Sequence, residues 1–209
     1  MNRTTPQVDF KRLIAAGALI FHFTSGYAQE SPDGMVMRVT DEVLNIVRTD
    51  KQIRNSDLVK ATTVAETVVA PHIDFSRLAV DLLPGSWSSA TTSQQERVTG
   101  EIKTFLVRML ATSLSTLGDE RVVLDTSVVA PNGKDALVRC KVLSPGKSTE
   151  SLEFALEKKD NAWKVYEMKL GGVSVFGVYR DQFSPIVRTQ GIDGLISTLE
   201  KRNSSARTK

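Results

Sequence analysis

Few side chains in this sequence could act as a nucleophile or a general base. Cys140 is the only cysteine, and the chain has two histidines, of which His72 follows Pro71 at the end of a predicted helix. A cysteine activated by a histidine is a common nucleophilic pair. Cys140, however, alternates with Val138 and Val142 on the apolar side of a predicted strand, which is typical of a small buried hydrophobe. His72 has the position of a surface or capping residue rather than that of a general base.

Motifs for other chemistry are missing from the sequence. It has no G-x-S-x-G, H-E-x-x-H, P-loop or G-x-G-x-x-G pattern. The pair Gly171–Gly172 lacks the strand–loop–helix context of a phosphate site, and a bulge or a flexible exit from a sheet explains it better. The carboxylates considered as a general acid or base are Asp74, Asp81, Asp125 and Glu167. Their spacing does not separate catalysis from ordinary solvation, so these residues alone identify no active site.

The N-terminal residues have the order of a secretory signal peptide. Lys11 and Arg12 precede a short apolar run, residues 13–23, and Gly26 and Ala28 suit the small-residue positions of a cleavage site. An uncleaved membrane anchor is the alternative, but it needs roughly 20 apolar residues, about twice the length of this run. No cysteine lies near the expected cut after Ala28, which excludes a lipid-anchored protein.

Export would leave one domain of about 180 residues, which is long enough to bury a core without disulfides. The formal net charge of +3 falls to about +1 without the predicted signal, and no basic patch of the kind used to bind nucleic acid remains outside the C-terminal tail. The predicted divisions are a signal peptide (1–28), a disordered leader (29–34), a single domain (35–202) and a frayed basic tail (203–209).

Apolar residues at helical spacing occupy the first half of the domain. Helices are predicted over residues 36–49, 56–69 and 74–83. A longer helix is expected to begin at a capping box formed by Ser93 and Glu96 and to end near Gly118.

From Arg121 onward the hydrophobic period changes to two, which indicates strands. The turn sequences PNG, PGK and KDN separate four alternating segments: RVVLDTSVVA, ALVRCKVLS, SLEFALEK and AWKVYEMK. Short connections favour an antiparallel meander. Alternation places Arg139 and Glu153 opposite the apolar side chains, so one face of the sheet is expected to contact water. VSVF is predicted to add a short strand, and two further helices are expected over residues 179–189 and from Asp193.

The predicted fold class is therefore α+β. An antiparallel sheet of about four to five strands is covered by the N-terminal helices and the two C-terminal helices, around a large apolar interior. This order of helices followed by a curved sheet also resembles an NTF2-like cone.

The C-terminal third contains an ordered series of short motifs: Trp163, Tyr166-Glu167, Gly172-Val173-Ser174, Tyr179-Arg180, Phe183, Gly191 and Asp193-Gly194-Leu195. In order and spacing this series resembles the end of the MlaC family of periplasmic phospholipid-binding proteins. Upstream, Pro71, Gly85 and Trp87 also look like family positions, so the resemblance covers most of the predicted domain.

The resemblance implies a carrier with no enzymatic activity, no cofactor and no metal, in which the sheet and the helices enclose an apolar cavity. Proteins of this kind hold a glycerophospholipid with its tails inside the domain, and carry it through the periplasm between an outer-membrane Mla lipoprotein complex and an inner-membrane Mla ABC transporter. The chemistry suits the task, because two acyl chains of about 30 methylenes would cost roughly 20 kcal/mol in water. The residues expected to line the lipid cavity are Leu78, Leu82, Trp87, Phe105, Leu106, Met109, Leu110, Phe154, Tyr166, Val173, Tyr179 and Phe183.

Two alternatives stay open on the sequence alone. One is a small enzyme on an NTF2-like cone that acts on a small hydrophobic substrate, and the other is an interaction domain with a solid core and no ligand. For each expected cavity residue, ordinary core packing is the competing interpretation.

Overall fold

The computed structural model describes residues 30–205, so the predicted signal peptide lies outside the described residues. The α-helices are α1 (Pro32–Thr49), α2 (Lys51–Arg54), α3 (Leu58–Val64), α4 (Phe75–Leu82), α5 (Thr92–Leu114) and α6 (Gly177–Ser205). Short helical segments of other types are η2 (Ala65–Val69), which is a π-helix, and the 3-10 turns η3 (Ala70–His72) and η4 (Trp87–Ser89). The strands are β1 (Arg121–Val129), β2 (Asp135–Leu143), β3 (Glu150–Lys159), β4 (Ala162–Leu170) and β5 (Val173–Ser174).

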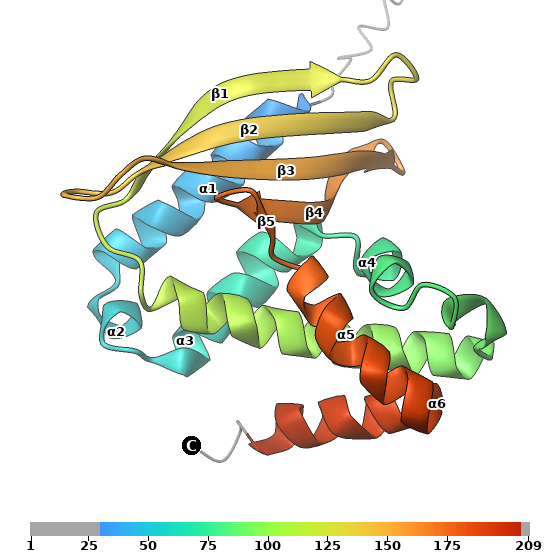
Figure 1. Cartoon of the computed structure of the whole chain (residues 1–209). Helices are drawn as coiled ribbons and strands as arrows, with labels where there is room; N and C mark the ends of the chain where they lie inside the picture. The colour runs from blue at the N-terminus through green and yellow to red at the C-terminus, as the bar shows by residue number, and fades with distance from the viewer. Residues whose placement is uncertain (1–29, 206–209) are drawn as a thin grey trace, which may run out of the picture.

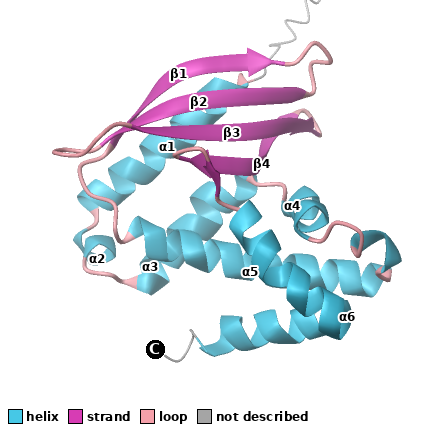
Figure 2. Ribbon diagram, viewed as in Figure 1, coloured by secondary structure: helices cyan, strands magenta, loops and turns pink. Residues whose placement is uncertain are grey.

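The strands form a single five-stranded antiparallel sheet in chain order, which confirms the predicted meander. In Figure 1 the sheet forms one layer, α1 lies next to it, and α3, α5 and α6 form a second layer beyond. Figure 2 shows the same division between strands and helices. The α+β class and the helical cover on one face of the sheet are thus as predicted.

Two groups of buried apolar side chains fill the interior. The larger group joins α3, α4, α5 and α6, and includes the fully buried side chains of Leu78, Leu106 and Leu195. The second group lies between α1 and the sheet, and packs Met35 and Val36 against strand residues such as Val138. A domain built this way has a seam between its two apolar groups, and that seam is where the candidate site lies.

The outer face of the sheet contacts water, as the alternation predicted. Arg139 on β2 pairs with Glu153 on β3 at 2.8 Å, and Lys141 pairs with Asp125 on β1 at 2.5 Å. On the opposite side of β2, Val138 and Cys140 are buried. The strand pattern therefore directs every inward side chain toward the helices.

The predicted boundaries of the domain were too narrow at both ends. Residues 32–34 of the predicted leader are helical, because the Ser31 hydroxyl accepts a hydrogen bond from the Gly34 N–H at 3.1 Å and caps α1. At the other end, α6 runs through Ser205, and Asn203 is buried with its amide donating to the Glu101 carboxylate at 2.7 Å. The predicted tail therefore begins as ordered helix rather than as a frayed end.

The long helix was predicted with the wrong cap. Its capping box is formed by Thr91 and Gln94, since Thr91 has extended backbone angles and residues from Thr92 onward are helical, which leaves Ser93 inside the first turn. The helix also ends at Leu114 rather than near Gly118.

The two expected C-terminal helices form one element with a break at Gly191. The backbone there has φ 69°, which glycine adopts without a side-chain penalty. Pro185 lies within the first half of α6.

Candidate functional site

A small apolar cavity, which we call the inner pocket, lies between α1, the sheet and the segment that follows α3. Its volume is about 70 Å³. Of the side chains that line it, only Thr40 and His72 are polar. The apolar lining includes Met35, Val39, Ile73, Leu110, Phe154 and Phe176.

The wall of the inner pocket formed by Ile73 is fixed to the sheet through the backbone. Ile73 forms an isolated parallel bridge with Val165 of β4, and the Asp74 N–H donates to the Val165 carbonyl at 2.9 Å. This attachment follows the irregular η2 and η3 turns, and Pro71 lies in the second of them. The chain thus leaves its helical course to place one wall against β4.

Asp74 strengthens the same attachment with its side chain. The carboxylate caps α4 by accepting from the Arg77 N–H at 2.9 Å, and it accepts from the Lys159 ammonium on β3 at 2.5 Å. Arg77 extends the connection by pairing with Glu157 at 3.0 Å. We call Asp74, Arg77, Glu157 and Lys159 the Asp74 network.

His72 is suited to an apolar wall because its neutral form is favoured. Burial lowers its pKa, and the positive charges of Arg38 and Lys164 lower it further, against the opposing effect of Glu30 and Glu42. The imidazole therefore carries no charge near neutral pH.

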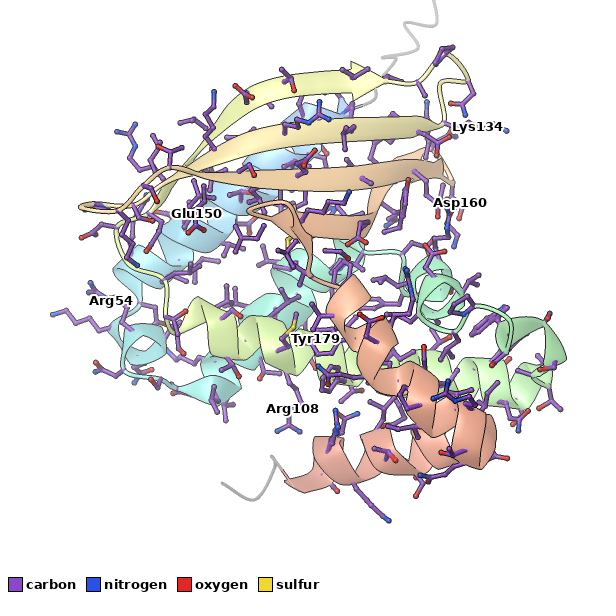
Figure 3. All side chains as sticks on the ribbon, in the orientation of Figure 1. Arg54, Arg108, Lys134, Glu150, Asp160 and Tyr179 are labelled. Carbon is purple, nitrogen blue, oxygen red and sulfur yellow. The ribbon has the colours of Figure 1, made fainter. Side chains whose placement is uncertain are left out.

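A second and much larger cavity, which we call the outer groove, lies between α3, α5 and the C-terminal part of α6. Its volume is about 970 Å³. Phe105, Met109 and Tyr179 contribute apolar surface to it, and Arg108 and Arg202 contribute positive charge. In Figure 3, Arg108 projects from α5 toward the second half of α6, and Tyr179 lies beside α5 at the start of α6.

Helix α5 and the start of α6 separate the two cavities. Met109 faces the outer groove and its neighbour Leu110 faces the inner pocket. The ring of Phe105 meets the ring of Tyr179 edge-on, with centroids 5.0 Å apart, and the Tyr179 hydroxyl donates to the Met109 sulfur at 2.8 Å. Burial raises the pKa of Tyr179, so the phenol stays neutral.

The expected cavity residues divide into four sets. Phe105, Met109 and Tyr179 line the outer groove, whereas Leu110 and Phe154 line the inner pocket. Four are fully packed in the helical core and line neither cavity: Leu78, Leu82, Leu106 and Phe183. The remaining three also lie outside the two linings: Trp87, Tyr166 and Val173.

Each residue of that last set has a physical reason for its position. Trp87 lies in the short η4 turn and packs against the edge of the helical core. Tyr166 occupies an irregularity in the β3–β4 pairing and lies beneath the guanidinium of Arg77, 4.6 Å from its ring centroid. Val173 belongs to the two-residue edge strand β5 and is 62% exposed.

The sequence interpretation missed several residues of the inner pocket. Met35, Val36 and Val39 come from the first turns of α1, which the sequence placed at or next to a leader. Ile73 and Phe176 lie in connecting segments, where hydrophobic periodicity carries no information about direction. The apolar character of α1 was visible, but its contact with the sheet was not.

The residues considered for catalysis have structural partners instead. Cys140 is buried, and burial raises the pKa of its thiol to about 11. Asp74 belongs to the network above, Asp81 pairs with Arg77, and Asp125 pairs with Lys141. Glu167 accepts a hydrogen bond from the Ser174 hydroxyl at 2.8 Å.

The described residues contain no cluster of His, Cys, Asp and Glu able to hold a metal ion. Within residues 30–205, no helix has both the length and the apolar character needed to cross a membrane.

Comparison with known proteins identifies what this arrangement resembles. The chain is 23% identical to toluene tolerance protein ttg2D of Pseudomonas putida over 186 residues, which is 86% of each chain. It is 19% identical to the intermembrane phospholipid transport system binding protein MlaC of Haemophilus influenzae, over 85% of this chain and 84% of that one.

A solved structure is also similar. The phospholipid-binding protein from Ralstonia solanacearum, in complex with a phospholipid, superposes with a TM-score of 0.73 at 28% identity, covering 82% of this chain and 96% of that one. The sequence profile described as MlaC protein matches residues 37–201, which is most of the domain. The chain therefore belongs to the MlaC family.

Proposed function

We propose that this protein is a phospholipid carrier. The observation that carries the proposal is the similar Ralstonia solanacearum structure, which holds a phospholipid and is 28% identical over 82% of this chain. The arrangement of the cavities agrees, since a largely apolar pocket lies close to a groove whose lining carries charged residues, and the groups considered for catalysis make structural contacts.

The inner pocket is the proposed site of the acyl chains. Leu110 and Phe154 face each other there across the seam between the helices and the sheet. At about 70 Å³ the pocket is far smaller than the roughly 300–1,000 Å³ of typical ligand sites. Binding of acyl chains must therefore widen the seam between the helices and the sheet. We propose that it opens at Met109 and Tyr179, which line the outer groove.

The carrier is proposed to act in the periplasm after removal of residues 1–28. Its proposed partners are an outer-membrane Mla lipoprotein complex and an inner-membrane Mla ABC transporter, between which it would shuttle lipid. Because the sequence has no P-loop, the energy to extract lipid must come from a partner that hydrolyses nucleotide. The proposed lipid-binding domain comprises at least residues 32–203.

Native mass spectrometry of the exported, purified protein tests the proposal. We expect a mass increase equal to about one phospholipid per chain, with the lipid identified after organic extraction. Delipidated protein should regain that mass when incubated with phospholipid vesicles. A folded protein that is empty on purification and takes no lipid from vesicles would refute the carrier function.

A further inference from the structure

The outer groove has an uneven distribution of charge. Arg108 and Arg202 contribute two positive charges to its lining, and Glu66 is the only carboxylate there. Three of its threonines donate to carbonyls of their own helices and have no proton left for a ligand: Thr63, Thr104 and Thr112. The guanidinium groups are therefore the strongest donors that the groove offers to an anion.

Both arginines retain unused donors. One N–H of Arg108 donates a hydrogen bond to the carbonyl of Asn203, which connects α5 to the end of α6. A guanidinium has five N–H donors, so most of those on Arg108 remain. Arg202 makes no hydrogen bond or ion pair with any other residue of the described part of the chain. Guanidinium groups match the oxygens of a phosphate in a two-pronged geometry.

The apolar side of the groove adjoins these charges. Phe105 and Met109 are on the same helix as Arg108, and Met109 lies one position along from it. On the facing wall, α3 exposes Leu58 and Val59 toward the groove, and Val59 is 79% exposed. Leu110, which follows Met109 in the chain, and Phe176, three residues before Tyr179, line the inner pocket. The groove therefore brings charge and exposed apolar surface next to segments that line the inner pocket.

We propose that the outer groove is the mouth of the lipid site, and that Arg108 and Arg202 bind the phosphodiester of the phospholipid. The tails then pass between Met109 and Tyr179 into the inner pocket. This inference rests on the proposed carrier function and assigns the recognition of the head group to this arginine pair.

A transfer assay with two lipids tests this assignment. Phosphatidylcholine vesicles carry either tail-labelled phosphatidylethanolamine or tail-labelled diacylglycerol, which has the same tails and no phosphate. In Arg202→Gln and in the double variant with Arg108→Gln, uptake of the phospholipid should weaken, by roughly tenfold in the double variant. Uptake of diacylglycerol should not change. Arg108→Lys, which keeps the charge, should restore part of the loss.

Arg97→Gln is the matched control. Arg97 also joins α5 to α6, through Glu200 at 3.0 Å, but it lies outside the groove lining. If Arg97→Gln and Arg108→Gln reduce the uptake of both lipids to the same extent, Arg108 acts by holding α5 and α6 together and the assignment is wrong. Arg202→Gln breaks no contact within the described residues, so it tests the proposal even if Arg108→Gln fails to fold.

The other outcomes are also decisive. Unchanged phospholipid uptake in the double variant would place the mouth elsewhere while leaving the carrier function intact. Wild-type protein that takes neither lipid would refute the carrier function itself. Saturable binding of inorganic phosphate that is as tight as phospholipid binding and needs both arginines would identify a free anion as the ligand, and would overturn the proposal.

Discussion

Replacing Asp74 should loosen the attachment that holds the wall of the inner pocket to the sheet. The carboxylate is 5% exposed and accepts hydrogen bonds from the Arg77 N–H and from the Lys159 ammonium. Asp74→Ala removes both contacts, whereas Asp74→Asn keeps the oxygen that caps α4 and removes the charge. The two variants therefore separate the cap from the ionic contact.

The expected costs follow from those contacts. Loss of a side-chain cap costs about 1 kcal/mol. The hydrogen bond to Lys159 is charge-assisted, but the lysine side chain is 49% exposed, so about 1–1.5 kcal/mol is expected, at or below the lower end of the usual range. Asp74→Ala should then lose about 2–2.5 kcal/mol of unfolding free energy and Asp74→Asn about 1–1.5 kcal/mol. For a domain of this size, the corresponding falls in Tm are about 5–10 °C and 3–5 °C.

The pH dependence gives an independent check. Burial alone would raise the pKa of Asp74, but the hydrogen bonds from Lys159 and the Arg77 N–H outweigh it and lower the pKa below the ordinary 3.8. A lowered pKa stabilises the fold above the unfolded value, and the stabilisation is lost as pH falls through the folded value. The gap between wild type and Asp74→Asn should be constant near neutral pH and should close in acid below about pH 4.

Urea denaturation at several pH values, followed by circular dichroism, measures these gaps. Arg139→Gln is the control, because its pair with Glu153 lies on the outer face of the sheet and should contribute less than about 1 kcal/mol. Equal stability of Asp74→Ala and wild type would refute the reasoning. So would a gap for Asp74→Asn that persists unchanged in strong acid.

Three further outcomes are expected. Leu110→Asp places a carboxylate in the inner pocket, where burial of a charge costs several kcal/mol, so no phospholipid should be extracted from the purified variant. The control Leu124→Asp, at a 43% exposed position, should retain its phospholipid. Phospholipid in both variants would contradict the assignment of the inner pocket. Cys140 is 1% exposed and burial raises the pKa of its thiol to about 11, so Ellman's reagent should react with it only after unfolding. Prompt reaction of the native protein would show that β2 is wrongly placed. Leu106→Ala should lower the unfolding free energy measured by urea denaturation by about 2–5 kcal/mol, because the Leu106 side chain is fully buried. Val59→Ala should leave it nearly unchanged. Similar denaturation midpoints for the two variants would contradict the described core.

The strands were the most predictable elements of this chain. Alternation fixes which side chains of β2 point inward, and the PNG, PGK and KDN turns leave little choice of pairing partner. Helix ends were less predictable, because Thr91 and Ser93 both begin acceptable capping patterns and only the tertiary path selects Thr91. The sequence likewise did not reveal that Asn203 is buried, since its partner Glu101 lies far away in the chain.

The candidate site was predicted in part because apolar character does not distinguish a cavity from a core. Leu106 and Leu110 have the same residue type and lie one helical turn apart on α5, yet Leu106 is fully packed and Leu110 lines the inner pocket. The difference depends on which residues of other segments face them, and the hydrophobic pattern of α5 does not contain that information. Phe105 and Tyr179, which were predicted to contact lipid, line the outer groove rather than the inner pocket, and their contact with lipid stays a prediction.

The division between inner pocket and outer groove bears on how a carrier can both hold and release lipid. Tails leaving water would gain roughly 20 kcal/mol, but tails arriving from a membrane leave one hydrocarbon environment for another and gain little. The partition of a phospholipid between the membrane and the protein then depends on smaller free-energy contributions. The chief ones are the cost of opening the packed seam beside Leu110 and, in the proposed site, the contacts of the head group with the outer groove. A partner that draws the arginines of the outer groove toward its own carboxylates would weaken head-group binding without entering the pocket. Release could then occur by competition for surface charge, with the seam closing behind the departing tails.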